Sequence, residues 1–437
     1  MSSWFEAYRE DIAKALENNI LHVALDRLTS TFSSARVAAI RKLPYYQYYK
    51  KRAREIKSWS INHLSELIKS VKEAVESLSG VFYLARDAEE CRNYVLKICL
   101  DHEAKLIVKS KSMVTEEIFL NDVLIDKGIE VVETDLGEWI VQLRGEKPSH
   151  IVGPALHVTR EEVAKLFSKI TGRILPPDNI PLLTVVAREK LREKFINADI
   201  GISGANVIAA ETGTVFILEN EGNARFATNA PPVYICISGI EKLVPTVEDA
   251  MLISRVITPN ATGQLVPVYI SLITGPSRTG DIEMNLSLGV HGPKEFYLIL
   301  VDNGRSRMIN DPDFKEASYC VRCGACLNEC PVYREIGGHV WGYRYMGGIG
   351  AIWTMFTHGL DKAAPIAFTC ATCARCKNVC PMEIDIPSMI IKLRNRLMEA
   401  GYIPPPFINT IESLKSYSNP FGIQIRKEIA ENKLLYS

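Results

Sequence analysis

Two cysteine-rich stretches decide how this chain is interpreted: CVRCGACLNECP at residues 320–331 and CATCARCKNVCP at residues 370–381. Each contains four cysteines in the pattern C-x2-C-x2-C-x3-C, and a proline follows the last cysteine. Runs of this kind hold [4Fe-4S] cubanes, with three thiolates of one run on one cluster and the fourth on the other. The sequence therefore predicts two [4Fe-4S] clusters in a duplicated region.

The crossed pattern divides the eight cysteines into two ligand sets. We assign Cys320, Cys323, Cys326 and Cys380 to cluster 1, and Cys370, Cys373, Cys376 and Cys330 to cluster 2. Intervals of two residues let the backbone wrap a corner of the cubane, and Gly324 and Ala325 leave room for it. A pair of zinc sites is the alternative, but zinc sites typically show CxxC pairs separated by a longer spacer.

The surroundings of the two runs indicate a helical domain over residues 314–400. The segment between them includes GGIGAIWTMFTHGL (347–360), which is mostly helical in pattern and longer than the connections of small bacterial ferredoxins. His339 and His358 fall in this segment, and we expect packed or surface histidines because eight cysteines already satisfy two clusters. Residues 401–437 are predicted to form a C-terminal tail that begins near three prolines.

Upstream of the cysteines, the pattern predicts a helical N-terminal segment and then an α/β domain. Residues 1–80 repeat apolar positions at intervals of three and four, as helices do. Residues 81–302 alternate helical segments with short β-branched runs, which indicates a largely parallel sheet. These runs are KLIVKS, IEVVET, LLTVVA, GTVFILE, PVYICIS and FYLILVD. Residues 303–313 are polar and are predicted to link this domain to the cysteine-rich one.

Polar and glycine-rich turns follow the predicted strands, at residues 110–112, 133–135, 219–223 and 302–305. Ligands of open α/β sheets bind at the carboxyl ends of the strands, so these turns predict a candidate cleft. Gly, Asn and Asp also simply make turns, and that alternative stays open for each segment. Glu219 and Glu221 lie two residues apart and could act as an acid-base pair or as solvated or salt-bridged carboxylates.

Composition argues against several classes of protein. Lys plus Arg and Asp plus Glu are both 51, so no overall field would attract nucleic acid. The N-terminus lacks the pattern of an export signal, and no apolar stretch approaches the roughly 20 residues of a membrane span. We expect a cytoplasmic protein with reduced thiols, whose only contact with the membrane is peripheral, at its inner face and through partners. Cys91, Cys99 and Cys236 are expected to be buried small hydrophobes.

Several long segments resemble one known family, lactate utilisation protein B, the iron-sulfur subunit of a three-part lactate utilisation system. The segments are KSKSMVTEEI (109–118), EVVETDLGEWIVQLRGEKPSHIVGPALH (130–157), GISGANVIAAETGTVFILENEGNARF (201–226), GIEKLVPTVEDA (239–250), LGVHGPKEFYLILVDNGR (288–305) and CVRCGACLNECPVYREIGGH (320–339). The resemblance implies an α/β LUD-type domain, with the fold of CoA transferases and sugar-phosphate isomerases, joined to an α-helical dicluster ferredoxin domain.

The function that the resemblance implies is oxidation of L-lactate, or of a related 2-hydroxy acid, to pyruvate. The chain would be a non-catalytic redox subunit through whose clusters the electrons leave. No G-x-G-x-x-G follows a strand, so no nicotinamide or flavin fingerprint is present, and the catalytic residues are not identified. Family positions that could line a small-anion cleft are Glu211, Glu219, Arg225, His291 and Lys294.

The segment SNPFGI (418–423) resembles the stretch that, in heterodisulfide-reductase-type proteins, leads into a cysteine-rich CCG domain. An ordinary Asn-Pro turn is the alternative, and it stays open. A separate CCG-domain redox subunit and a second LUD-type subunit are therefore expected partners, and a flavoprotein dehydrogenase or a quinone-linked acceptor is a further option. Two other hypotheses stay open. The α/β domain could itself be an enzyme that binds a carboxylate or phosphate ester, with the clusters secondary. The chain could also be a redox-sensing module, although it shows no DNA-binding signature.

Overall fold

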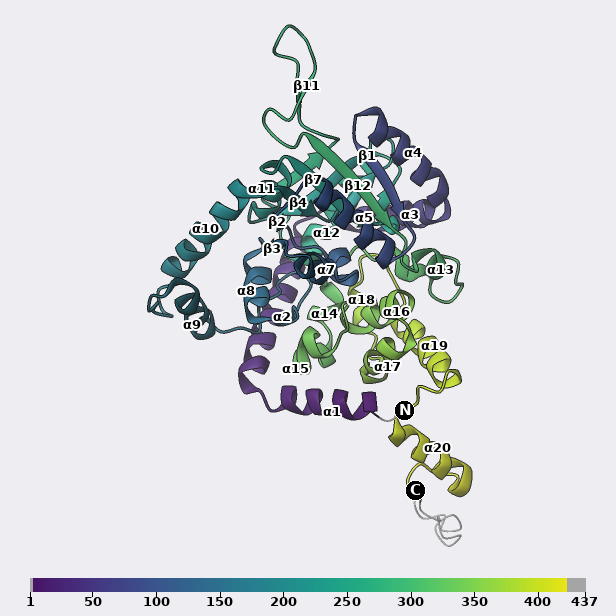
Figure 1. Ribbon diagram of the computed structural model, residues 1–437. Helices are drawn as coiled ribbons and strands as arrows, with labels where there is room; N and C mark the ends of the chain where they lie inside the picture. The colour runs from purple at the N-terminus through teal and green to yellow at the C-terminus, as the bar shows by residue number, and fades with distance from the viewer. Residues whose placement is uncertain (1–2, 423–437) are drawn as a thin grey trace.

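A six-stranded parallel sheet forms one part of the computed structural model, which describes residues 3–422 (Figure 1). Its order is β1-β12-β7-β4-β2-β3, and every neighbouring pair is parallel. The strands are β1 (Val81–Ala85), β12 (Glu295–Val301), β7 (Val233–Gly239), β4 (Ile200–Ser203), β2 (Leu106–Lys109) and β3 (Glu130–Glu133). β4 and β7 are buried along their whole length, because helices cover both faces of a parallel sheet. The predicted α/β domain is confirmed.

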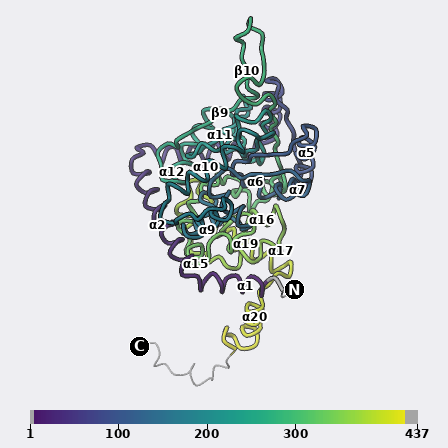
Figure 2. The backbone as a smooth tube through the Cα atoms, turned by 60° about the vertical axis from the view of Figure 1, so that its left-hand side comes forward, coloured from purple at the N-terminus to yellow at the C-terminus, as the bar shows by residue number. Residues whose placement is uncertain are grey.

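A smaller mixed sheet stands beside the first one in the order β8-β5-β6-β9. Its strands are β8 (Leu243–Val244), β5 (Val207–Ala209), β6 (Thr214–Glu219) and β9 (Tyr269–Ile273). The short strands β10 (Arg278–Thr279) and β11 (Ser287–Leu288) belong to a hairpin that projects at one end of the molecule, opposite the C-terminal helix α20 (Pro405–Tyr417) (Figures 1 and 2).

The helices of the α/β part are α5 (Ala88–Asp101), α6 (Met113–Glu117), α7 (Leu120–Asp126), α8 (Leu136–Arg144), α9 (Arg160–Thr171), α10 (Ile180–Asn197), α11 (Asn223–Asn229) and α12 (Val247–Ala261). The predicted strand LLTVVA is wrong, because residues 182–187 lie in α10. The side chain of Asn179 caps this helix, and Pro181 lies in its first turn. Its buried residues Leu183, Ala187 and Leu191 follow helical spacing. The helical spacing of buried residues extends over the whole of α10, whereas the β-branched run is short, so the segment forms a helix.

Four N-terminal helices join the two parts of the chain: α1 (Ser3–Leu16), α2 (Asn19–Arg41), α3 (Tyr46–Asn62) and α4 (Leu64–Ser77). Helix α2 packs against α12 of the α/β part and against α14 (Ala325–Asn328) and α15 (Pro331–Val340) of the cysteine-rich part. One hydrophobic core contains residues of all three regions, such as Leu25, Ile253 and Trp353. The two parts are therefore held in one arrangement by shared packing.

The cysteine-rich part is helical, as predicted. It contains η2 (Lys315–Tyr319), α14 (Ala325–Asn328), α15 (Pro331–Val340), α16 (Gly347–His358), α17 (Leu360–Thr369), α18 (Arg375–Val379) and α19 (Ile386–Glu399). The predicted linker includes a short helix, α13 (Arg305–Ile309), which packs against η2 and α16. Residues 423–437 of the predicted tail lie outside the described residues. Over residues 3–422, no helix is long and apolar enough to cross a membrane.

Candidate functional site

The two cysteine runs fold in the same way. In the first run, Arg322 and Gly324 flank Cys323 with left-handed φ values of 61° and 78°. In the second run, the corresponding residues Thr372 and Ala374 have φ values of 50° and 64°. Successive left-handed turns direct backbone N–H groups toward one side of a loop, and the Thr372 N–H donates to Cys370 Sγ over 3.4 Å. Both loops are therefore shaped to wrap a group that accepts hydrogen bonds at sulfur.

The eight cysteines gather around two adjacent cavities. Cys320, Cys323, Cys326 and Cys380 line the first cavity. Cys330, Cys370, Cys373 and Cys376 line the second cavity, where Cys326 also reaches the wall. The last cysteine of each run thus lies with the first three of the other run, as a crossed arrangement requires. The two cavities also share Leu327, Ile349 and Ile386, so they lie side by side.

The donor set fits a multi-atom cluster. A single zinc ion would draw four sulfurs to about 2.3 Å from one point. Four cysteines surround each of the two spaces, and four thiols around a space are what a [4Fe-4S] cubane needs.

The two cavities differ in exposure. In the first run, Cys323 and the two following residues are buried, and Cys380 from the second run is 9% exposed. In the second run, Cys373 is exposed, as are Arg375 and Lys377. Burial raises the pKa of Cys323 and of Cys330 to about 12, so these thiols are protonated in the metal-free chain. Cluster insertion must therefore release protons.

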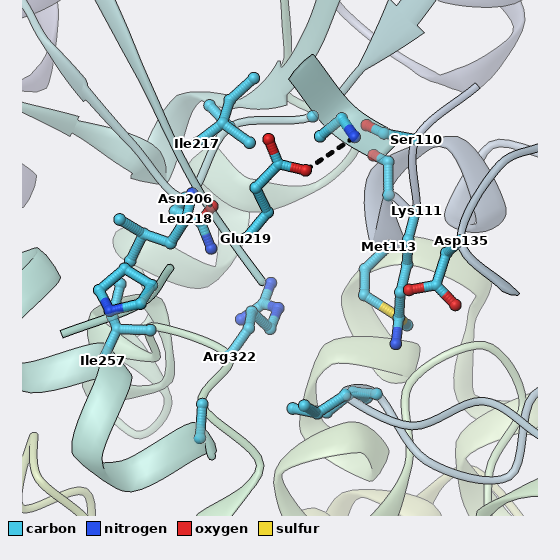
Figure 3. Close-up of a pocket in the computed structure, with 18 of the residues that line it drawn as sticks. Ser110, Lys111, Met113, Asp135, Asn206, Ile217, Leu218, Glu219, Ile257 and Arg322 are labelled. Carbon is cyan, nitrogen blue, oxygen red and sulfur yellow. Dashed lines mark hydrogen bonds between the residues drawn. The ribbon is translucent and has the colours of Figure 1, made fainter. Parts of the chain in front are cut away.

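A cleft of about 290 Å³ lies between the strand ends of the α/β part and the cysteine-rich part (Figure 3). The loops after β2, β3, β4 and β6 supply Lys111, Asp135, Asn206 and Glu221, as expected for an open α/β sheet. The cysteine-rich part supplies Arg322 and Tyr345. Ile151, Arg322 and Tyr345 also line the first cysteine cavity, so the cleft and that cavity have a common wall.

Titratable groups crowd the cleft. Burial lowers the pKa of Lys111, against the opposing charges of Glu138 and Asp135. Burial also raises the pKa of Glu138, behind the cleft wall on α8, to about 8. Lys242, which follows β7, lines the cleft, and burial lowers its pKa to about 8. The carboxylate of Glu219 accepts hydrogen bonds from the backbone N–H groups of Ala224 at 2.8 Å and Arg225 at 2.9 Å.

A buried ion network connects the α/β part to the first cysteine loop. Arg305 donates to both carboxylate oxygens of Glu117 at 2.8 Å and to Glu241 at 2.6 Å, and all three side chains are fully buried. Arg322 reaches the other oxygen of Glu241 at 3.3 Å and stacks on Trp353. Burial raises the pKa of Glu241, but Arg305 and Arg322 outweigh burial and hold that pKa at about 2. The carboxylate therefore stays ionised.

The structure does not bring the five predicted anion-site residues together. Glu219 lines the cleft, whereas Glu211, Arg225, His291 and Lys294 are exposed and do not line it. Glu211 accepts a hydrogen bond from Val247 N–H at 2.8 Å, and Arg225 stacks on Tyr269.

Two cleft residues were not predicted individually as ligand-binding residues. Lys111 is part of the predicted turn at 110–112, and Arg322 lies between Cys320 and Cys323 in the first cysteine run. Of the two histidines between the cysteine runs, His358 hydrogen-bonds the Glu117 carbonyl at 2.9 Å and His339 stacks on His157. Cys91, Cys99 and Cys236 are fully buried and line neither cysteine cavity.

Comparisons with known proteins agree with this organisation. The LUD domain model matches residues 68–301, and the 4Fe-4S dicluster domain model matches residues 316–384, which indicates that the chain binds iron-sulfur clusters. Lactate utilization protein B of Shouchella clausii is 38% identical over 90% of this chain and 81% of that protein. Lactate utilization protein B of Oceanobacillus iheyensis is 35% identical over 98% of this chain and 88% of that protein.

Two further proteins are similar. A protein of Escherichia coli named uncharacterized electron transport protein YkgF is 36% identical over 90% of this chain and 81% of that protein. The crystal structure of a DUF162 family protein from Deinococcus radiodurans covers 55% of this chain and 98% of that chain, with 13% identity and a TM-score of 0.31.

Proposed function

This chain belongs to the lactate utilization protein B family, and we propose that it is the electron-transfer subunit of a complex that oxidises L-lactate, or a related 2-hydroxy acid, to pyruvate. Two [4Fe-4S] clusters would carry the electrons through the chain. Cluster 1 would be held by Cys320, Cys323, Cys326 and Cys380, and cluster 2 by Cys370, Cys373, Cys376 and Cys330. The names of the relatives support roles in lactate utilization and in electron transport.

One observation carries the proposal: three spaces follow one another through the molecule. The cleft shares a wall with the first cysteine cavity, and that cavity shares a wall with the second. The first cavity is buried in the core, and the second opens toward solvent at Cys373. We infer that electrons enter at cluster 1 and leave from cluster 2, where exposed Arg375 and Lys377 would meet the next carrier.

A relay of this kind needs partners for the two-electron chemistry. Fully ligated clusters are one-electron carriers, whereas oxidation of a hydroxy acid requires a hydride acceptor or an open metal site. We propose that a CCG-domain subunit, together with a second LUD-type subunit, supplies that site. A flavoprotein or a quinone-linked carrier would then accept electrons from cluster 2.

We expect the purified chain alone to be inert toward lactate. With the partner subunits present, anaerobic addition of lactate should bleach the broad iron-sulfur absorbance. Cys376→Ser should stop onward electron flow while leaving partner binding intact, because Cys376 lines the second cavity and is only half-buried. Bleaching of the single chain by lactate at a catalytic rate would contradict the relay.

That contrary result would favour a second candidate function, in which the α/β part is itself an enzyme. The observation in its favour is the cleft, where burial lowers the pKa of Lys111 and raises the pKa of neighbouring Glu138 toward neutrality. A carboxyl whose pKa is raised to about 8, as burial raises that of Glu138, can transfer protons near pH 7. The same bleaching experiment separates the two functions, because only the enzyme hypothesis predicts turnover without partners.

A further inference from the structure

The ammonium group of Lys111 is the most unusual feature of the cleft. Its nitrogen is buried and has no hydrogen-bond partner within the described chain. Lys109, two residues earlier, differs completely: its ammonium contacts Glu133 at 2.6 Å and Thr115 at 2.8 Å. A buried ammonium without an acceptor is unfavourable, so a cleft that holds one is suited to a ligand that supplies the acceptor.

Four carboxylates line the cleft, and none of them accepts a hydrogen bond from Lys111, although Asp135 and Glu221 attract its charge. Asp135 caps α8 by accepting from Glu138 N–H at 3.0 Å. Glu219 accepts the two backbone N–H groups at the start of α11, and Glu241 binds Arg305 and Arg322. The fourth, Glu221, accepts one long hydrogen bond, from Leu136 N–H at 3.5 Å. The ammonium of Lys111 thus has attractive carboxylates nearby but no hydrogen-bond acceptor among the described residues.

Arg322 supplies a second cation from the other side. Figure 3 shows Lys111 descending from the α/β part and Arg322 rising from the cysteine-rich part toward the same cavity. A guanidinium has five N–H donors, and over residues 3–422 Arg322 makes two long hydrogen bonds, to Glu241 at 3.3 Å and to the Cys320 carbonyl at 3.5 Å. Donor capacity is left for a ligand between the two cations.

We propose that this cleft binds a small carboxylate anion between Lys111 and Arg322, and that its binding lowers the reduction potential of cluster 1. The volume of about 290 Å³ suits a compact organic acid. Arg322 lies between Cys320 and Cys323 and lines both the cleft and the first cysteine cavity. A carboxylate beside Arg322 adds negative charge near the cluster, which disfavours the added electron.

The inference rests on the proposed function only for the presence of cluster 1, and the binding itself needs no turnover. If the relay operates, the carboxylate would be the 2-hydroxy acid or its oxidised product. Phosphate is the competing ligand chemistry, because it also accepts charge-assisted hydrogen bonds from Lys and Arg.

Anaerobic calorimetry on the reconstituted chain tests binding with sodium L-lactate, sodium pyruvate and inorganic phosphate as probes. Lys111→Met keeps the length and packing of the side chain and should weaken carboxylate binding about tenfold or more, the size of one charge-assisted hydrogen bond. Lys190→Met is the matched control, because Lys190 is exposed on α10 and does not line the cleft. Iron content confirms that both variants fold. Unchanged carboxylate affinity in Lys111→Met, or binding of phosphate alone, would overturn the inference.

A potentiometric titration tests the link to cluster 1, which the Cys323→Ser variant identifies by its missing signal. Pyruvate at a concentration near its wild-type Kd should shift the midpoint of cluster 1 downward in the wild-type chain and in Lys190→Met, and the shift should be much smaller in Lys111→Met, whose site is then mostly empty. Linkage requires the reduced chain to bind pyruvate more weakly by the matching factor. Binding without any shift would refute the coupling. Failure of the proposed relay would give a different result: lactate would not reduce the clusters even when the partner subunits are present.

Discussion

Replacing Cys380 with serine is expected to remove the same cluster as replacing Cys323, although the two residues belong to different runs. Both line the first cavity, and neither lines the second. Anaerobically reconstituted wild-type chain should contain about eight irons and about eight labile sulfides, and each variant about four of each. Their EPR spectra in the reduced state should be the same, because both retain only cluster 2.

The reciprocal pair tests the other half of the crossing. Cys330→Ser and Cys373→Ser should both lose cluster 2 and keep cluster 1. Cys99→Ala is the control, because Cys99 is a fully buried thiol outside both cavities and should leave the iron content unchanged. If Cys380→Ser instead matched Cys373→Ser, each run would ligate its own cluster, and the crossed assignment would be wrong.

Loss of cluster 1 and loss of cluster 2 should also differ in their effect on the stability of the fold. Cys323 and Cys380 belong to the hydrophobic core that joins the N-terminal helices to α12 and the cysteine-rich part, whereas Cys373 is exposed. Because cluster binding is coupled to folding, loss of cluster 1 should loosen the contact between the two parts more than loss of cluster 2.

The sequence was informative where a feature depends on neighbouring residues. The cysteine spacing predicted which side chains would gather, because ligand loops are local and the crossing follows from their duplication. Four turns were predicted to face a cleft, and those after β2, β3 and β6 do, whereas residues 302–305 after β12 do not, because Arg305 is buried in the ion network instead. β2 and β3 are parallel neighbours, so their carboxyl ends meet at one edge of the sheet. Lys111, Asp135 and Glu221 indeed line it.

The remainder depended on packing that no local pattern encodes. Arg322 and Tyr345 reach the cleft only because the cysteine-rich part docks against the strand ends. The β-branched residues of LLTVVA suggested a strand, but the cap at Asn179 and the helical spacing through Phe195 made the segment a helix. Polar residues 303–313 suggested a linker, but Arg305 in this segment is buried. Its partners, Glu117 and Glu241, are distant in the chain, so no local pattern indicates its burial.

Arg305→Met is expected to produce the largest loss of stability among substitutions away from the cysteines. The guanidinium is fully buried and binds Glu117 through two hydrogen bonds and Glu241 through a third. Removing it leaves two buried carboxylates without their main counter-charge, a change worth about 3–5 kcal/mol in comparable buried pairs. A methionine occupies a similar volume, so the loss of stability would come mainly from the missing charge and only slightly from a cavity.

The backbone at the end of β7 leaves room for the Arg305 side chain. A Cβ on Gly239 would lie 2.3 Å from Arg305 Nε and 2.0 Å from Glu241 Oε2, so glycine at the end of β7 is what permits the ion pair. Glu241 also contacts Arg322, which lies in the walls of the cleft and of the first cysteine cavity. Loss of Arg305 should therefore disturb cluster 1 along with the contact between the two parts.

Anaerobic urea titration of the holoprotein measures the effect, with tryptophan fluorescence and cluster absorbance as separate probes. Arg305→Met should move both midpoints to clearly lower urea, and absorbance should fall first because the loop that carries Arg322 loses its support. Arg86→Met is the control: Arg86 pairs with Glu90 at 2.7 Å, but its side chain is 84% exposed, and exposed pairs contribute little. Equal midpoints for the two variants would mean that the buried network does not hold the two parts together.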